Sequence, residues 1–239
     1  MTESFRPLIF AAMLALVLGV PAMAIRAAAE SEPEKPSIYL TWQAPFGQPR
    51  AADTLSADCD STHADTLWLS FDPGHASPTF LAVSADIVFH PAVGDTLGPF
   101  WGGDDEAAKR WIKVESEPNP GLGYPMPYRT NGSGGWLFKR DGRNALIRWI
   151  YATPYGNAVG ITRQIFVAAR IIMRHTPALA QRCQQPICIE WAESEITYDI
   201  GPARNFVHSG PNRFVSLNSP GGAVCEPYRR AARLHGWKP

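Results

Sequence analysis

The sequence has no excess of charge of either sign. Its 239 residues include 22 Lys and Arg side chains against 22 Asp and Glu side chains, and only 18% of the residues are charged. Nucleic acids and anionic membranes attract proteins through basic surfaces, so the overall charge predicts neither partner. An apolar content of 45% excludes wholesale disorder, because a chain of this composition can bury a core.

The sequence also lacks a recognisable catalytic or metal-binding motif. Ser133 stands in the run Asn131–Gly135, which lacks the first glycine of a nucleophile elbow. The six histidines show no HExxH spacing, and His63, which stands among three aspartates, fits a solvated loop better than a cation site. Glu193 and Glu195 share one face of an expected strand, unlike the facing carboxylates of a glycosidase. We therefore expect no catalytic residue, no metal and no cofactor.

Long apolar runs are scarce, and the first one is short. Leu8–Val20 is an apolar or glycine stretch of 13 residues, below the roughly 20 that a membrane-spanning helix needs. Arg6 precedes it, and Ala22-Met23-Ala24 follows it as an A-x-A cleavage site. We therefore expect a signal peptide over residues 1–24, a flexible leader over 25–36, and a secreted or periplasmic protein. A signal anchor is the alternative, although no later segment is long and apolar enough to span a membrane.

Only four cysteines are present, and all lie beyond the expected signal peptide: Cys59, Cys183, Cys188 and Cys225. An even number in an exported chain predicts two disulfides. Cys183 and Cys188 are close enough in sequence for a local loop staple, which leaves Cys59 to bridge to Cys225. A zinc site is the alternative, but one CxxxxC pair with two remote cysteines matches zinc spacing poorly.

Turn-forming residues, in contrast, are plentiful: 20 glycines and 22 prolines separate short runs in which apolar and polar residues alternate. Alternation with a period of two is typical of half-buried strands. It predicts strands over Ile38–Trp42, Thr66–Phe71, Phe80–His90, Asn144–Thr153, Ile187–Ile200 and Arg213–Leu217. Ile161–His175 fits either a strand or an amphipathic helix, and its content of Ile, Val and Phe favours a strand.

A long stretch rich in glycine and proline, Pro91–Gly135, is expected to form a loop insertion. Short helical turns are expected at Asp104–Val114, inside this stretch, and at the basic tail Arg229–Arg233. The chain shows no internal repeat and no second domain boundary. The sequence therefore predicts a single all-β domain over residues 37–239, an Ig-like or jelly-roll β-sandwich with a long loop insertion and short helical turns.

Aromatic residues fall into two groups. Trp68 and Trp149 alternate with other strand residues and are expected in the core. A second group gathers in and beside the expected loop, and it consists of Trp101, Trp111, Tyr124, Tyr128 and Trp136. Aromatic rings on loops are efficient recognition surfaces, because a rigid ring gives a large contact area at small entropic cost. We therefore predict the second group as a ligand-binding site; the alternative is a satellite cluster that buries the loop against the sandwich.

The order of the strands resembles that of the cohesin-like β-sandwich, which is related to carbohydrate-binding modules. Residues Asp65–Phe71 and Ala85–Pro91 are similar to two alternating strands of that family, with His90 where the family usually has Asp. Its later strands are similar to Asn144–Trp149, Phe166–Arg174 and Ile187–Asp199. The resemblance covers about residues 55–200. It implies non-catalytic recognition of a protein partner or a glycan, and it transfers no contact residue.

These observations favour an exported, non-catalytic recognition module that binds a protein or a glycan at or outside a bacterial cell envelope. Two alternatives stay open at the level of the sequence. One is a structural envelope protein whose loops serve only an assembly. The other is a secreted hydrolase, which would require Glu or Asp side chains that converge in a deep pocket.

The first prediction concerns processing. Because the apolar stretch is short and an A-x-A site follows it, we expect the exported protein to begin at Ile25, or at Glu30 if the second site Ala27-Ala28-Ala29 is used. N-terminal sequencing of exported material measures this directly. Exported material that still begins at Met1 would contradict the signal peptide.

Overall fold

The chain was analysed as a computed structural model, which describes residues 36–58, 64–98, 101, 105–116, 123–127, 132–154, 156–174, 184–198, 204–206 and 212–234. All of these residues belong to one compact unit of the chain, Lys35–Pro239. The expected signal peptide and most of the expected leader lie outside the described residues. None of the helices in the described ranges is long and apolar enough to cross a membrane.

Most of the described residues form two β-sheets. The four-stranded sheet has the order β1 (Ser37–Trp42), β3 (Ala64–Asp72), β9 (Phe166–Arg174) and β5 (Ile112–Glu115). The eight-stranded sheet has the order β2 (Thr54–Leu55), β12 (Phe214–Leu217), β10 (Ile187–Tyr198), β4 (Ser77–Pro91), β7 (Asn144–Ala152) and β6 (Ser133–Asp141). Two short strands complete it, β11 (Arg204–Phe206) beside β10 and β8 (Val159–Ile161) beside β4. All the pairings are antiparallel except that of β2 with β12.

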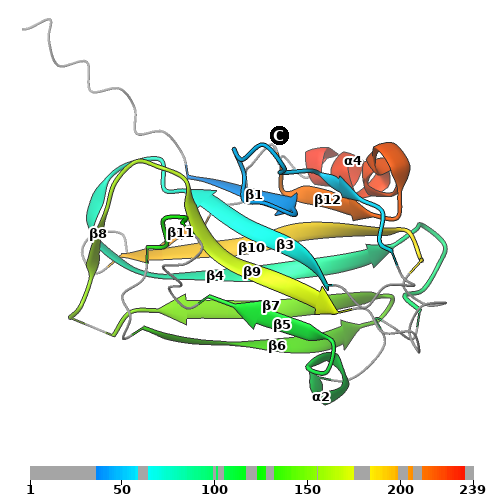
Figure 1. Cartoon of the computed structure of the whole chain (residues 1–239), viewed down its shortest axis with the longest axis horizontal. Coiled ribbons are helices and arrows are strands. Elements are labelled where there is room, and N and C mark those ends of the chain that lie inside the picture. The colour runs from blue at the N-terminus through cyan, green and yellow to red at the C-terminus, as the bar shows by residue number, and fades with distance from the viewer. Residues whose placement is uncertain are drawn as a thin grey trace, which may run out of the picture. The chain divides into compact units, whose positions relative to one another are not determined.

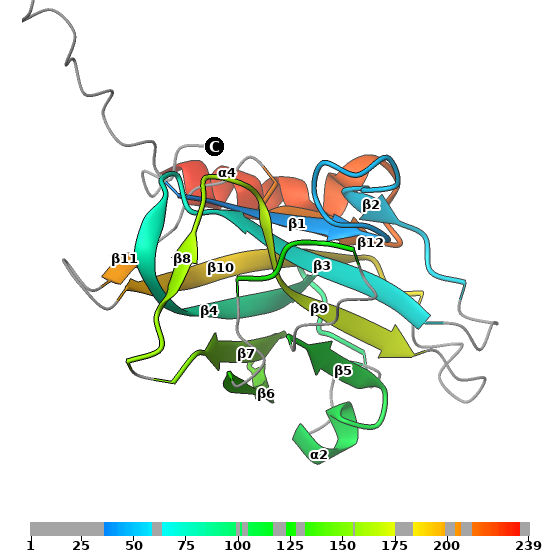
Figure 2. The ribbon, with the colours of Figure 1, turned by 60° about the vertical axis from the view of Figure 1, so that its left-hand side comes forward.

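The two sheets pack face to face and enclose one core (Figures 1 and 2). Leu67, Leu69 and Phe71 of β3 supply fully buried side chains from one sheet, and Ile87 and Phe89 of β4 supply them from the other. Each set is spaced two residues apart, because successive side chains of a strand point to opposite faces. The predicted all-β sandwich is therefore confirmed.

The described part of the ambiguous segment Ile161–His175 contains strands and no helix, since β8 ends at Ile161 and β9 occupies Phe166–Arg174, while His175 lies outside the described residues. The expected helical turns are only partly present. Helix α2 covers Asp105–Ala108 alone, after which the chain enters strand β5. The basic tail lies within helix α4, Glu226–Leu234, which a 3-10 helix, η4 (Pro220–Cys225), precedes.

Strand β6, Ser133–Asp141, is an element that the sequence pattern missed. It begins inside the stretch that was expected to be a loop. One of its two glycines is needed for packing: a Cβ atom on Gly134 would lie 2.3 Å from the backbone oxygen of Ile150, whereas one on Gly135 would meet nothing within 4 Å. Glycine marks a close approach of two strands at this position, not a turn.

The disulfide pairing inferred from sequence spacing was wrong. The structure joins Cys188 to Cys225, with their Cα atoms 4.9 Å apart, and each predicted pair used one of these two residues. Cys188 is the second residue of the extended strand β10, so its side chain points toward η4 rather than back along the chain. Cys59 and Cys183 lie outside the described residues.

Replacing Cys188 or Cys225 with Ala is expected to lower the free energy of unfolding by about 3 to 4 kcal/mol, because a bridge between residues 37 apart restricts the unfolded chain. The double variant should lose no more than either single variant, since both remove one bridge. Denaturant melts under non-reducing conditions measure these losses, and peptide mapping should recover the crosslinked pair. Additive losses would show that the two cysteines are not partners.

Candidate functional site

The eight-stranded sheet has one face on the core and another that points away from it. We call part of the second face the outer face, and it consists of Ser84, Asp86 and Val88 of β4, Leu137 and Lys139 of β6, Leu146, Arg148 and Ile150 of β7, and Glu193 and Glu195 of β10. Their inward neighbours Ala85, Ile147 and Trp149 are buried. Alternation along four neighbouring strands therefore produces this surface.

The strand register aligns one row of side chains across the outer face. Leu137 of β6 is opposite Arg148 of β7, Arg148 is opposite Asp86 of β4, and Asp86 is opposite Glu193 of β10. Side chains at directly opposite positions of antiparallel strands lie on the same side of the sheet and interact. Residues far apart in the sequence thus form one continuous strip.

Asp86 and Arg148 form a two-point ion pair at the centre of this row. Arg148 donates from Nε to Asp86 Oδ1 at 2.8 Å and from Nη2 to Oδ2 at 2.6 Å. The hydrogen bonds to Asp86 and its charge raise the pKa of Arg148 above the ordinary value, and the charge of Glu193 adds to the effect. The guanidinium side remains open to solvent, with a side-chain exposure of 60%.

Two depressions, of about 310 and 250 Å³, lie next to each other on this face. Asp86, Arg148 and Glu193 line both of them. Ile150 borders the first, and Leu146 borders the second. The ion pair therefore separates two small hollows on a broad surface.

Large apolar side chains are exposed on this face. Leu137 is 43% exposed and Ile150 is 50% exposed, and of the exposed large hydrophobic residues in the described ranges only Val93 lies elsewhere. The described helices leave the surface uncovered, since α4 lies beside β12 and α2 beside β5 and β6 (Figure 1). Leu137 and Ile150 are diagonal neighbours on this face, since Leu137 is opposite Arg148 and Ile150 lies two residues further along β7.

The other end of the same sheet face is covered. His90 of β4 and Glu190 of β10 point to the same side as Asp86, as the alternation predicted for His90, but both are buried. The ring of Tyr228 from α4 stacks on His90 at 4.2 Å, and the Tyr228 hydroxyl donates to the backbone oxygen of Pro91. The disulfide between Cys188 and Cys225 lies in the same small apolar cluster as Tyr228.

A buried ion pair anchors this covered end. Glu190 Oε2 lies 2.9 Å from His90 Nε2, and Arg213 donates to Glu190 Oε1 at 2.5 Å. Burial lowers the pKa of Arg213 below its ordinary value, and the charge of Glu190 opposes this by raising it. A buried charge without its partner is costly, so this group holds the C-terminal helix in place and does not face a ligand.

The predicted aromatic site is divided by the structure. Trp101 is 1% exposed and stacks on Phe89, so it belongs to the core, and Trp111 is 8% exposed and packs edge-on against Trp101. Trp101 and Trp111 thus match the alternative, a cluster that buries the loop against the sandwich. Burying an indole between the sheets is favourable because it removes a large apolar surface from water. The remaining core prediction is confirmed, since Trp68 and Trp149 are buried.

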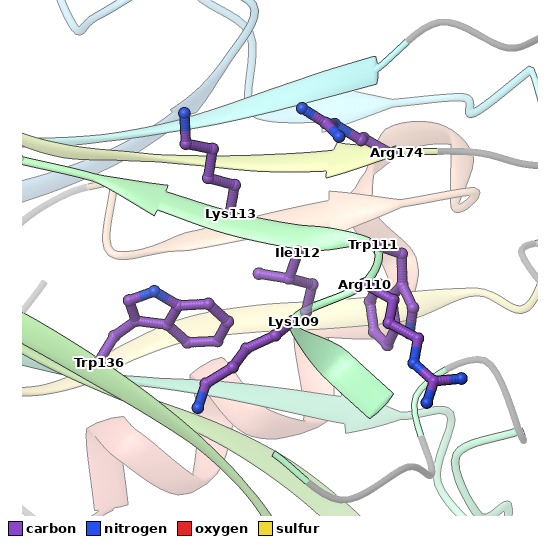
Figure 3. A pocket seen from close by; sticks show the side chains of 7 residues that line it. All are labelled: Lys109, Arg110, Trp111, Ile112, Lys113, Trp136 and Arg174. Atoms are coloured by element: carbon purple, nitrogen blue, oxygen red, sulfur yellow. The ribbon is translucent and has the colours of Figure 1, made fainter. Parts of the chain in front are cut away.

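Of the other three predicted aromatic residues, two are partly exposed to solvent and one lies outside the described ranges. Trp136 is partly buried on β6, and with Trp111 it lines a cavity of about 180 Å³ (Figure 3). Tyr124 is partly buried and packs edge-on against Trp68. Tyr128 lies outside the described residues. The structure thus brings Trp111 and Trp136 together and leaves Tyr124 at a different contact.

Sequence reasoning missed the outer face. Of its members, only Glu193 and Glu195 were expected to share a strand face, and Leu137 belongs to β6, which the sequence pattern missed. The signal that could have found it is Ile150, a large apolar residue at an outward position of an alternating strand. Within the described ranges no three His, Cys, Asp or Glu side chains cluster in a way that could hold a metal ion, and His63 lies outside those ranges.

No protein-family model matches the sequence, and no curated protein matches it. Several solved cohesin modules are similar in structure. One matching chain, from a type I cohesin–dockerin complex of Clostridium thermocellum, has 10% identity over 79% of this chain and 96% of its own, with a TM-score of 0.41. A type I cohesin from Pseudobacteroides cellulosolvens has 7% identity over 77% and 90%, with a TM-score of 0.38. A type III cohesin module from Ruminococcus flavefaciens has 11% identity over 77% and 87%, with a TM-score of 0.31.

The two ion pairs of this sheet face should respond differently to substitution. Glu190→Gln is expected to cost about 3 to 5 kcal/mol of stability, because it leaves the buried guanidinium of Arg213 without its counter-charge. Arg148→Gln should cost less than about 1 kcal/mol, because the pair with Asp86 is largely exposed on the Arg148 side. Denaturant melts of both variants measure this. Equal costs would mean that the outer pair is also a structural element.

Proposed function

We propose that the protein is a non-catalytic recognition module that binds a protein partner through the outer face. The observation that carries this proposal is the exposure of Leu137 and Ile150 beside Arg148, the solvent-facing member of the Asp86–Arg148 pair. Protein interfaces combine apolar anchors with polar groups that set the register. The outer face has both apolar and polar side chains, and the opposite faces of its strands pack in the core, which holds these side chains in place.

The charges of the face define the chemistry of the partner. Four carboxylates line it or its depressions, those of Asp86, Asp141, Glu193 and Glu195, and the cations Arg148 and Lys139 are fewer. A complementary surface carries basic side chains around an apolar centre, because charge complementarity guides association and suppresses wrong partners. The expected partner therefore presents Lys or Arg side chains beside an aliphatic or aromatic contact.

The shape of the face favours a protein over a glycan. No aromatic side chain lies among its outward residues. Sugar rings are usually held by aromatic platforms, which present a flat apolar surface with a polar edge. A protein partner needs a wide contact surface, and the four adjacent strands of the outer face provide one.

The arrangement of the carboxylates argues against hydrolysis. Both oxygens of Asp86 accept hydrogen bonds from Arg148, which leaves this group poorly placed to transfer a proton. Glu193 and Glu195 point to the same side of one strand and do not face each other across a pocket. The surface thus suits binding, with no nucleophile or acid–base pair assigned to it.

Export completes the proposal. The Cys188–Cys225 bridge suits an oxidising compartment, since disulfides persist mainly outside the cytosol. Together with the signal peptide expected over residues 1–24, it supports action in the periplasm or outside the cell. The partner is therefore sought among exported proteins.

A display library of exported protein fragments from the source organism tests this proposal, with a glycan array run in parallel. For a selected partner, Ile150→Asp and Leu137→Asp should each weaken binding at least about tenfold, because a buried carboxylate replaces an apolar anchor. Val93→Asp is the matched control, as Val93 is 68% exposed outside this face, and it should bind as the unaltered protein does.

Thermal melts of the three variants must agree with the unaltered protein, so that a loss of binding is not a loss of fold. A partner that binds Ile150→Asp and Leu137→Asp as tightly as the original would remove the outer face from the proposal. Binding to glycans alone would overturn the choice of a protein partner.

A further inference from the structure

Strand β6 is an edge of the eight-stranded sheet, so only its β7 side is paired with another strand of that sheet. We call its first part, Ser133–Leu137, the open edge. The residues of the open edge are exposed except for Trp136, which is partly buried. Toward the other end of β6, Arg140 donates from Nη2 to the backbone oxygen of Leu97 at 3.0 Å and from Nη1 to that of Trp101 at 3.3 Å. A loop is thus held against that end, and the open edge is the accessible part of the strand.

The backbone of the open edge presents polar groups that point away from β7. Asp141 and Asn144 close the β6–β7 hairpin over a two-residue turn, so this pair exchanges both of its backbone hydrogen bonds. Hydrogen-bonded pairs recur at every second position, which directs the N–H and C=O of Gly134 and Trp136 away from β7. Within the described ranges these groups have no other backbone partner. Each of the two residues therefore offers one donor and one acceptor.

An extended chain is the ligand that fits such an edge. Donors and acceptors at alternate residues match the spacing of a strand, and an added strand satisfies them without a change in the sheet. Natural proteins usually protect accessible edges with charges, prolines or bulges. The open edge contains no charged residue and no proline, and its register with β7 is continuous. Its sequence therefore does not oppose pairing with another chain.

Gly135 leaves a gap in the outer face beside Ile150. The two residues are directly opposite each other, and a Cβ atom on Gly135 would meet nothing within 4 Å. Ile150 is 50% exposed here, and Leu137 is 43% exposed two residues along β6. An added strand places one side chain next to Gly135 and another next to Leu137, because outward positions recur every two residues. Large apolar side chains at both positions would cover all three residues.

The alternate side chains of an added strand point to the opposite side of the sheet, toward Trp136. Trp136 and Ile112 contribute apolar walls to a cavity of about 180 Å³ between the edge strands β5 and β6, and they lie on the same side of β5 in Figure 3. A compact apolar side chain next to Trp136 would pack against the indole ring there. The segment that fits the open edge is therefore apolar on both of its faces near the centre.

A second copy of this chain fits the open edge less well. In an antiparallel pairing confined to the two open edges, Gly134 of one chain is opposite Trp136 of the other, and the two Gly135 residues are opposite each other. The gap beside Ile150 would then stay empty. We propose that the open edge takes up an extended segment of the protein partner as an added strand, with large apolar side chains beside Gly135 and Leu137. This mode of binding rests on the function proposed for the outer face, to which Leu137 and Ile150 also belong.

Backbone amide exchange of the ¹⁵N-labelled full chain tests this mode of binding. The probe is a linear peptide selected on the full chain from a phage-displayed library of random sequences. The amides of Gly134 and Trp136 should exchange rapidly in the free chain, and the peptide should slow both at least about tenfold, because each N–H gains an acceptor. The amides of Gly135 and Leu137, which bond to β7, are the internal control.

Slow exchange at Gly134 and Trp136 in the free chain would mean that the edge is already occupied, and it would overturn the proposal. Sedimentation of the full chain would then show whether a second copy is the occupant. A selection that yields no binder, or only peptides that leave both amides unchanged, would also overturn it.

Two substitutions of Trp136 isolate the contribution of the backbone. Trp136→Pro and Trp136→Ala both remove the indole, but only proline removes the N–H that points away from β7. The peptide should therefore bind Trp136→Pro at least about tenfold more weakly than Trp136→Ala. Equal affinities for the two variants would show that no backbone hydrogen bond forms at this edge.

A substitution of Gly135 tests the gap beside Ile150. Gly135→Val fills the gap and should weaken peptide binding about tenfold, while the melting temperature should not fall, because the new Cβ atom has open space. Gly160→Val is the matched control, since Gly160 is an exposed strand glycine on β8 with equally open space, and it should bind as the unaltered protein does. Equal binding by Gly135→Val and Gly160→Val would overturn the side-chain contact beside Gly135.

The same variants distinguish this mode of binding from the function on which it rests. An exported partner that loses affinity with Ile150→Asp, yet binds Trp136→Pro and Trp136→Ala equally, would overturn the added strand and leave the outer face as the binding surface. A partner that is indifferent to Ile150→Asp and Leu137→Asp would overturn the outer face, and with it the apolar contacts proposed for the added strand.

Discussion

The antiparallel pairing of β4 with β10 decides which side chains can meet elsewhere in the molecule. Ile187 is opposite Pro91 at one end and Tyr198 is opposite Phe80 at the other, so the register is continuous along both strands except at two irregularities. One of these lies at Ala192, between Trp191 and Glu193. If the same sequence paired in regular register without this bulge, Glu193 would be opposite Ala85 and point into the core, and Ile196 would point out of it, because a shift of one residue reverses the faces of a strand.

The same sheet face uses ion pairs in two ways, and the difference comes from what lies above them. Glu190 with Arg213 is closed off by the C-terminal helix, through Tyr228 and the disulfide. Asp86 with Arg148 has no such cover from the described helices, so its guanidinium meets solvent. One arrangement fixes an element of the fold at a cost in desolvation, and the other remains available to a partner.

Most of the long strands could be predicted from the sequence, but the residues of the outer face could not. Alternation marked β3, β4, β7 and β10 because each has one face on the core. It missed β6, because Gly134, which the close approach to Ile150 requires, and its neighbour Gly135 resemble a loop in the sequence. It also missed the pairing of Cys188 with Cys225, since strand direction and helix packing decide that contact. The burial of Trp101 and Trp111 depends on the space between the sheets, which no local pattern encodes.

Strand β6 is an edge strand whose two sides have different surroundings. It is the last strand of the larger sheet, and β5 is the last strand of the smaller one, so the space between them opens to solvent at one side of the sandwich. Trp136 closes the inner side of this opening, and Leu137 projects from the outer side. Strand alternation points Trp136 and Leu137 to opposite sides of β6, so the partly buried ring packs against the core while its sequence neighbour is exposed.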